Sequence, residues 1–320
     1  PANAFIPQSS PLHLSGQELS VGSCKRFRQW EAKTPGHPEV HHTAGIEVTT
    51  GPLGQGYANG VGFGIAERFL AERYNRPYDE IVDHRVYCIA SDGDLQEGIA
   101  SEAASLAGHL RLEKLVVLYD DNHIQLDGPT SMAWSEDVPA RFEAYGWHTQ
   151  RVEDGNDLVA IEDAIERART DGRPSLIAVR PHIGFGRPNR QATSTPHCQA
   201  PAPDQGRQTT PAPGAAPARP VHGPREARDH FRAAIPEGEA LVAEWEARLG
   251  RYADTHPAEA AEFRRRIGRT LASGWDADLQ TYEVGTEIAT RNAGKDANQA
   301  PASPRPELFG CAAHRPAPNL

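Results

Sequence analysis

The sequence has few of the residues that build disulfide scaffolds or cysteine-based metal sites. Only four cysteines occur among 320 residues, and they are widely scattered. No pair is spaced as Cys-x-x-Cys, so the sequence predicts neither a zinc site nor a disulfide framework. The four are Cys24, Cys88, Cys198 and Cys311.

Long apolar runs and basic excess are also missing. No apolar stretch reaches the roughly 18 residues that a membrane-spanning helix needs. Acidic residues outnumber Lys and Arg by 43 to 33, giving a formal net charge of -10. This argues against a nucleic-acid binder, because contacts to phosphates require basic side chains. Residues 1–10 lack a basic segment followed by an apolar one, so we expect no signal peptide and a cytoplasmic location.

The first 190 residues alternate between two kinds of apolar pattern. Short runs with β-branched members predict buried strands, and apolar residues at helical spacing predict helices between them. Strands that alternate with helices in this way are typical of a doubly wound α/β fold, a parallel sheet with helices on both faces. The predicted strands are 85–90, 115–119, 147–152 and 175–179, and the predicted helices are 55–74, 99–110 and 158–169.

The pattern changes after residue 190. A stretch crowded with Pro, Ala, Gln and Thr carries almost no large apolar side chains, so we expect it to lack regular structure. Helical periodicity resumes near Arg225, which predicts a helical extension, and the tail is again rich in proline. The sequence therefore predicts a main domain, an irregular linker, a helical extension and a final segment. Their expected bounds are 1–190, 191–224, 225–285 and 286–320.

Polar side chains follow the first two predicted strands directly. Residues 90–98 read Ala-Ser-Asp-Gly-Asp-Leu-Gln-Glu-Gly, and residues 119–124 read Tyr-Asp-Asp-Asn-His-Ile. In an open parallel sheet, ligands bind beyond the carboxyl ends of the strands. We therefore expect both segments to line one ligand-binding edge.

The donors in these segments suit a hard cation. Asp92 offers a carboxylate oxygen, Asn122 an amide oxygen and Ile124 a backbone carbonyl. Such oxygens, completed by diphosphate and water, are typical of octahedral magnesium. Gly93 would let the backbone approach a phosphate closely.

Simpler interpretations compete with each motif. Asp92-Gly93-Asp94 resembles the start of a calcium loop, but Glu97 stands where that loop needs glycine and Ala103 where it needs glutamate. The same residues also fit a solvated turn. Residues 51–56 fit a plain turn before a helix, although a helix N-terminus behind glycines is also where a phosphate binds. His37 fits a surface histidine equally well.

An aspartate-glycine pair after one strand and an asparagine after the next form the thiamine-diphosphate-binding motif, and the chain resembles transketolases in several further segments. The similarity covers about residues 12–190 closely and 225–310 loosely. These segments read Lys-Thr-Pro-Gly-His-Pro-Glu at 33–39, Thr-Thr-Gly-Pro-Leu-Gly-Gln-Gly at 49–56, Arg-Phe-Glu-Ala-Tyr-Gly-Trp at 141–147, and Ile-Gly-Phe-Gly with Pro-Asn at 183–189.

The resemblance implies a transferase of the pentose phosphate pathway. Such an enzyme uses thiamine diphosphate to move a two-carbon ketol unit from a ketose phosphate to an aldose phosphate, and the cofactor supplies the difficult chemistry. The implied metal is Mg²⁺, with Ca²⁺ or Mn²⁺ as substitutes. Implied metal ligands are Asp92, Asn122 and Ile124; implied cofactor contacts are Gly51, Pro52, Leu53, Gly93, Asn122 and His197; implied catalytic residues are His37 and His197.

The sequence also departs from the family pattern. Ser91 replaces the first glycine of the usual Gly-Asp-Gly triplet, and 191–224 does not match. The family's opening segment and its pyrimidine-binding domain have no counterpart beyond a remnant in 286–320. We therefore expect the chain to need those parts for activity, as a homodimer or with a partner chain that carries the pyrimidine-binding domain. A non-catalytic fragment with at most weak cofactor binding is the alternative, and dihydroxyacetone synthase or phosphoketolase chemistry is a lesser one.

Overall fold

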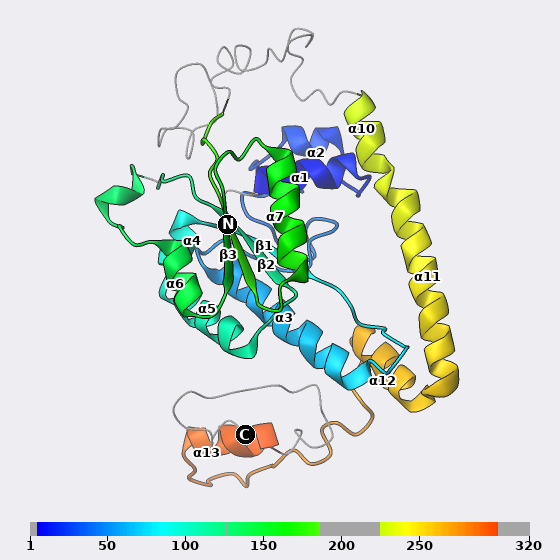
Figure 1. The fold of residues 1–320 in the computed structure, drawn as a ribbon. Coiled ribbons are helices and arrows are strands. Elements are labelled where there is room, and N and C mark those ends of the chain that lie inside the picture. Colours follow the sequence, from blue (N-terminus) through cyan, green and yellow to red (C-terminus); the bar gives the residue numbers. More distant parts are fainter. Residues whose placement is uncertain (1–4, 126, 186–224, 300–320) are drawn as a thin grey trace. The chain divides into compact units, whose positions relative to one another are not determined.

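The computed structural model describes residues 5–125, 127–185 and 225–299 (Figure 1). The chain divides into two compact units, residues 1–246 and residues 247–320. The first unit contains the sheet and all the predicted site residues that fall within the described part.

A four-stranded parallel sheet forms the centre of the first unit, in the order β1-β2-β4-β3. Each strand lies within one residue of its predicted bounds, so the predicted parallel sheet is confirmed. In the register, Ser91 lies opposite Asp120, and Asp120 lies opposite Val179. The strands are β1 (Val86–Ser91), β2 (Leu115–Asp120), β3 (His148–Val152) and β4 (Ser175–Val179).

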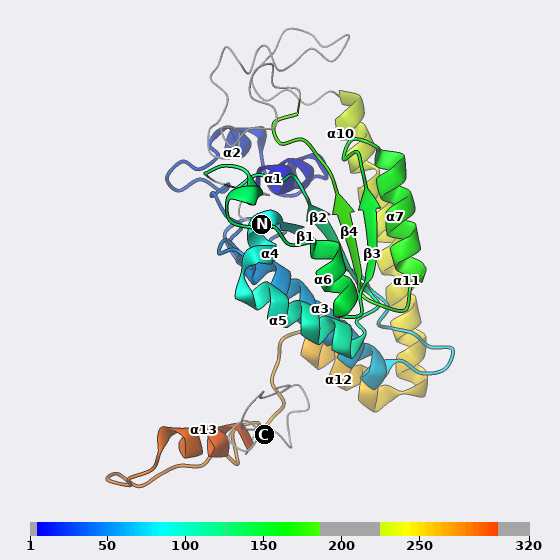
Figure 2. The same ribbon diagram turned by 60° about the vertical axis from the view of Figure 1, so that its left-hand side comes forward.

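Helices cover both faces of the sheet, as predicted (Figure 2). One face packs against α3 (Gln55–Tyr74), α5 (Gly98–Leu110) and α6 (Val138–Ala144), and the other against α7 (Leu158–Thr170). The two apolar layers exclude water from both faces of the central strands β2 and β4, so burial of apolar surface stabilises the sheet, while Tyr87 and Ile89 of β1 are exposed.

Small residues let α5 approach its neighbours closely. Ala100, Ala104 and Ala107 are all buried on one side of this helix. Gly108 has no room for a side chain, because a Cβ there would overlap the carbonyl oxygen of Tyr145. The backbone of α5 therefore packs directly against the turn that follows α6.

Several short helices were not predicted, among them α1 (Phe5–Leu14), α4 (Asp92–Gln96) and α6. In α1 the apolar residues do not recur at helical spacing, and Pro11 lies inside the helix. For α6 the usual start signals are present, because the Asp137 carboxylate accepts from Ala140 N at 3.2 Å and a proline lies in the first turn.

The chain beyond the linker is helical, as the sequence predicts, but only to Ile267. Here the structure has α10 (Arg225–Arg232), α11 (Ala234–Thr255) and α12 (Pro257–Ile267), and residues 268–289 form turns only. A further helix, α13 (Thr290–Gln299), lies in the predicted final segment. The predicted irregular linker, 191–224, lies outside the described residues.

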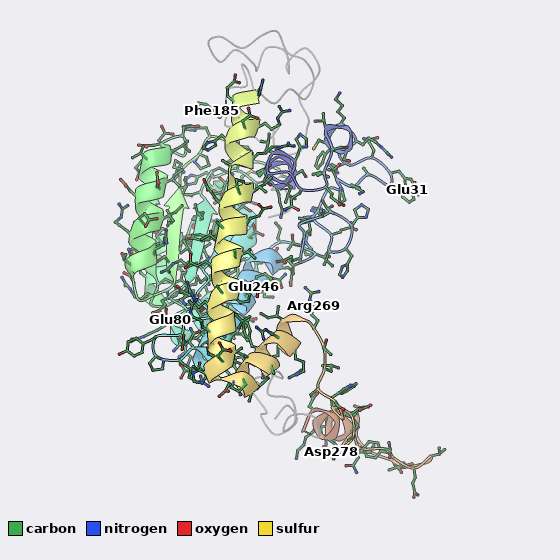
Figure 3. The ribbon with its side chains drawn as sticks, turned by 90° about the vertical axis from the view of Figure 1, so that its right-hand side faces the viewer. Glu31, Glu80, Phe185, Glu246, Arg269 and Asp278 are labelled. Carbon is green, nitrogen blue, oxygen red and sulfur yellow. The ribbon has the colours of Figure 1, made fainter. Side chains whose placement is uncertain are left out.

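The first half of α11 is tied to the loop after α3. The Trp245 indole donates a hydrogen bond to the carbonyl of Ile81 at 2.9 Å, next to Glu80 in the same loop (Figure 3). Among the described residues, no helix combines the length and the apolar composition needed to span a membrane.

Candidate cofactor-binding site

The carboxyl ends of β1 and β2 bring the two polar segments together. Because Ser91 and Asp120 are register partners, Asp92 and the residues after Asp120 leave the sheet at the same edge. The backbone N–H of His123 donates to Asp92 Oδ2 at 2.9 Å. This hydrogen bond fixes the loop that carries Asn122 beside Asp92, as the sequence predicts.

Asp92 is a buried acid in a polar pocket. Its side chain is only 2% exposed, and the Tyr119 hydroxyl donates to its Oδ1 at 2.5 Å. Burial raises the pKa of Asp92, the hydrogen bond from Tyr119 lowers it, and the nearby charge of Asp121 raises it further. A buried ionised carboxylate is costly without a compensating positive charge. The charged form of Asp92 is therefore disfavoured unless a positive charge lies nearby.

At the carboxyl end of β2, the carboxylate of its last residue contacts an amide of the following loop. Asn122 Nδ2 donates to Asp120 Oδ2 at 3.1 Å, and Asn122 Oδ1 accepts from Ile124 N at 2.9 Å. The other carboxylate oxygen of Asp120, Oδ1, is buried and has no partner. Burial raises the pKa of Asp120 to about 6; the Asn122 hydrogen bond opposes the rise, and the charges of Asp92 and Asp121 add to it.

The adjacent acid, Asp121, has a different environment. Its carboxylate lies 2.8 Å from Arg180 Nη2 and 3.1 Å from His123 Nε2. Both oxygens therefore have nitrogen partners, which is the usual state of a buried carboxylate that stabilises a fold. Asp120 and Asp121 are neighbours in sequence, but only Asp120 keeps a free buried oxygen.

The glycine-rich turn before α3 lies against the start of α4. Gly54 N donates to Asp94 Oδ1 at 2.9 Å, and Gly54 adopts a left-handed φ of 74°. Leu53 covers Gly93, because a Cβ on Gly93 would lie 3.3 Å from Leu53 Cδ1. The N-terminus of α3, a helix of 20 residues, therefore opens next to the Asp92 segment. A helix N-terminus of this length favours an anion.

His37 lies next to the same turn. Its side chain is exposed, and a Cβ on Gly51 would lie 3.2 Å from His37 Cγ. Thr50 N donates to the Pro38 carbonyl at 3.2 Å, which holds the two segments together. The structure thus gathers His37, Gly51, Leu53 and Gly93 around one turn. The other predicted histidine, His197, lies outside the described residues.

Asp94 and Tyr119 belong to this region but were not singled out from the sequence. Asp94 is 2% exposed and links α4 to both β1 and the glycine-rich turn. The spacing Ser91-x-x-Asp94 just after a strand is a helix-start signal from which α4 was predictable. Nothing in the local sequence indicates that the Tyr119 hydroxyl contacts Asp92, because that contact depends on the sheet register.

The Arg-Phe-Glu-Ala-Tyr-Gly-Trp segment at 141–147 supports α4 and α5. Arg141 donates to the Leu95 carbonyl at 2.9 Å and to Ser101 Oγ at 2.8 Å. The Trp147 indole donates to the Ala104 carbonyl at 2.9 Å. This segment therefore holds the helices that carry the site and does not itself line it.

Ser91 makes two hydrogen bonds that a glycine would only partly keep. Its backbone N–H donates to Asp94 Oδ2 at 3.0 Å, and its hydroxyl donates to the same oxygen at 2.8 Å. We expect Ser91→Gly to lower the free energy of unfolding by about 1 kcal/mol, since one hydrogen bond is lost. Cofactor affinity is expected to change less than roughly threefold. Urea unfolding and a cofactor titration check this, and a tenfold loss of affinity would contradict it.

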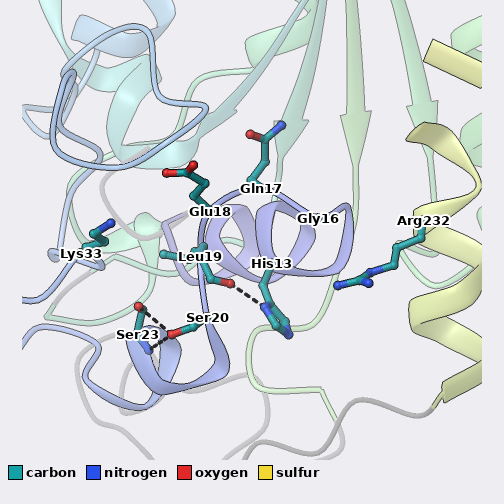
Figure 4. A pocket seen from close by; sticks show the side chains of 9 residues that line it. All are labelled: His13, Gly16, Gln17, Glu18, Leu19, Ser20, Ser23, Lys33 and Arg232. Carbon is teal, nitrogen blue, oxygen red and sulfur yellow. Dashed lines mark hydrogen bonds between the residues drawn. The ribbon is translucent and has the colours of Figure 1, made fainter. Parts of the chain in front are cut away.

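A separate pocket lies beside α1. It has a volume of about 400 Å³ and lies between α1, the segment before α2 (Val21–Lys25) and the end of α10 (Figure 4). Most of its lining residues are polar or charged, and His13 contacts the Leu19 carbonyl at 2.6 Å. The pocket contains none of the predicted site residues. It is lined by His13, Gly16, Gln17, Glu18, Leu19, Ser20, Ser23, Lys33 and Arg232.

The donors at the strand ends fit a cation shared with a ligand. Within the described residues, no three His, Cys, Asp or Glu side chains are arranged to hold a metal by themselves. One carboxylate, one amide and one carbonyl therefore require oxygens from a bound anion and water to complete an octahedron. The free oxygen of Asp120 agrees with such an arrangement.

An open parallel sheet with polar loops and a glycine-rich turn at one edge defines a diphosphate-binding α/β domain. Residues 4–272 match the model of the transketolase thiamine diphosphate-binding domain, so the chain belongs to that family. It is 48% identical to a transketolase of Geobacillus stearothermophilus over 303 residues, which are 94% of this chain and 45% of the relative.

Two further transketolases match nearly the whole of this chain. A chloroplastic transketolase of Spinacia oleracea is 43% identical over 317 residues, with 98% of this chain and 43% of the relative covered. The solved transketolase of Leishmania mexicana superposes with a TM-score of 0.90 and 40% identity, covering 98% of this chain and 48% of the solved chain. The chain thus spans less than half the length of these relatives, and the predicted family resemblance is confirmed.

Proposed function

We propose that this chain binds thiamine diphosphate through a divalent cation at the carboxyl ends of β1 and β2. The observation that carries the proposal is the hydrogen bond from His123 N to Asp92, which unites the two halves of the binding motif. In this proposal, Asp92, Asn122 and the Ile124 carbonyl hold the cation. Mg²⁺ is the preferred ion because all the donors are oxygens, with Ca²⁺ or Mn²⁺ as substitutes.

The turn before α3 would hold the rest of the diphosphate end. Gly51, Pro52 and Leu53 form this turn, and Gly93 lies under Leu53. The N-terminus of α3 adds backbone N–H groups directed at an anion. Gly51 has no side chain, so a phosphate could approach its backbone closely. His37, which lies against Gly51, would face the substrate and carry a proton there near neutral pH.

The reaction we propose for the whole protein is the transfer of a two-carbon ketol unit between sugar phosphates, as in the pentose phosphate pathway. Bound thiamine diphosphate would supply the carbon–carbon bond chemistry. The residues of this chain would bind the diphosphate, orient it and exclude water from it. We also propose His197 as a substrate- or cofactor-facing residue, a dimer or a partner subunit with a pyrimidine-binding domain, and a cytoplasmic location.

For the purified 320-residue chain we expect cofactor binding without turnover. In the family, an acid on the pyrimidine-binding domain activates the cofactor, and the matched residues 4–272 correspond to the diphosphate-binding domain. A coupled assay with xylulose 5-phosphate and ribose 5-phosphate checks this, with thiamine diphosphate and Mg²⁺ present. Turnover well above an Asp92→Ala control would show that the chain alone is a complete catalyst. Absence of both binding and turnover would favour the non-catalytic fragment instead.

A further inference from the structure

Asp120 has a combination of contacts that fold stability does not explain. It lies at the end of β2, and one of its carboxylate oxygens is buried without a partner. The other acids of the same region, Asp92, Asp94 and Asp121, have both oxygens paired within the fold. A buried oxygen without a partner costs free energy, and at the end of a strand, beside other acids, this oxygen points to a ligand that would pair with it.

The paired oxygen of Asp120 controls the orientation of an amide. An ionised carboxylate accepts hydrogen bonds and donates none, so Asp120 Oδ2 selects the NH₂ group of Asn122, 3.1 Å away. The oxygen of Asn122 must then point the other way, where Ile124 N donates to it at 2.9 Å. A carbonyl oxygen has two lone pairs, and one remains for a cation. Without Asp120 only the Ile124 N–H opposes a half-turn of the amide, which would present its NH₂ group instead.

We propose that Asp120 is a positioning residue that sets the orientation of the Asn122 amide, so that its oxygen faces the cation of the diphosphate site. The unpaired Oδ1 of Asp120 is then available to a water of the cation's own shell, which Mg²⁺ usually retains. This inference rests on the proposed function, because it concerns the same site. It goes further by assigning a role to a residue outside the three predicted ligands. Residues that orient metal ligands typically affect metal affinity strongly.

The test uses two measurements. Mn²⁺ binding in the presence of thiamine diphosphate is followed by the loss of the electron paramagnetic resonance signal of free Mn²⁺. The melting temperature is measured on the protein without ligands. Asp120→Asn keeps the shape of the side chain. It no longer selects the NH₂ group of Asn122, because an amide can both donate and accept hydrogen bonds. We expect it to weaken Mn²⁺ binding by roughly tenfold or more without lowering the melting temperature. Asp121→Asn is the matched control: it removes the negative charge that faces Arg180 and His123, so it should lower the melting temperature and weaken Mn²⁺ binding less than Asp120→Asn does.

A double variant separates orientation from general structure. The double variant combines Asp120→Asn with Asn122→Asp. The carboxylate at residue 122 then presents an oxygen in either orientation, and the amide at residue 120 can donate a hydrogen bond to it. We expect this exchange to restore Mn²⁺ affinity to within roughly threefold of the wild type. Unchanged Mn²⁺ affinity in Asp120→Asn, a lowered melting temperature in that variant, or failure of the exchange to restore affinity would each overturn the inference. Failure of the wild-type chain to bind Mn²⁺ with thiamine diphosphate would instead refute the proposed function.

Discussion

Replacing Asp92 with alanine is expected to weaken cation-dependent binding of thiamine diphosphate by roughly a thousandfold, since about 4 kcal/mol is lost with a buried charged partner. Asp92 is the only one of the three proposed cation ligands that carries a negative charge. Its carboxylate is already positioned by Tyr119 and by the backbone of His123, so little ordering is needed when a cation binds. Isothermal titration calorimetry in Mg²⁺ measures the effect.

Two controls make the Asp92 result specific. Glu97→Ala removes an equal charge from an exposed side chain five residues away, and it should leave affinity nearly unchanged. Tyr119→Phe removes the hydroxyl that contacts Asp92 but keeps the carboxylate, so it should have a smaller effect than Asp92→Ala. Equal losses in Asp92→Ala and Glu97→Ala would show that overall charge, and not a ligand at residue 92, determines binding.

The largest effect on stability is expected for Gly108→Ala, which should lower the free energy of unfolding by about 3 kcal/mol. A Cβ at residue 108 would overlap the carbonyl oxygen of Tyr145 and lie 3.3 Å from Trp147 Cδ1. Both neighbours are fixed: Tyr145 through its backbone, and Trp147 through its hydrogen bond to Ala104. The helix α5 must therefore move away from the α6 turn, which opens the core. Urea unfolding measures the change.

Gly62→Ala is the matched control for Gly108→Ala. Gly62 is exposed inside α3, and nothing lies within 4 Å of the position its Cβ would take. Alanine favours the helix over glycine, so this variant should gain about 0.5–1 kcal/mol. A loss of stability in both variants would mean that the cost at residue 108 comes from some general effect of alanine, not from the contact with Tyr145.

The centre of the sheet was predictable because its two middle strands are short apolar runs that are buried on both faces. Leu115–Asp120 and Ser175–Val179 have this pattern, and their bounds agree with the prediction to within one residue. The position of Asp92 and Asn122 at one edge followed from the parallel arrangement alone. The helix α1 was not predictable in the same way, because Pro11 breaks the expected pattern.

The contacts around the predicted ligands could not be read from the sequence. The hydrogen bond from Tyr119 to Asp92 and the approach of Gly54 to Asp94 join residues 27 and 40 positions apart. They depend on which strands are neighbours and on how far each helix extends. The same holds for Asp120: its sequence position gives no sign that one of its oxygens is paired with Asn122 and the other is free.

A calorimetric titration of the wild-type chain with thiamine diphosphate, in Mg²⁺ and again in excess EDTA, tests the central claim most directly. We expect saturable binding of one cofactor per chain in Mg²⁺. In EDTA the affinity should be lower by roughly a hundredfold or more, because the cation joins the protein to the diphosphate. Thiamine without its diphosphate should not bind measurably under either condition. Equal affinity for thiamine and thiamine diphosphate, or affinity independent of Mg²⁺, would contradict a diphosphate-and-cation site at the ends of β1 and β2.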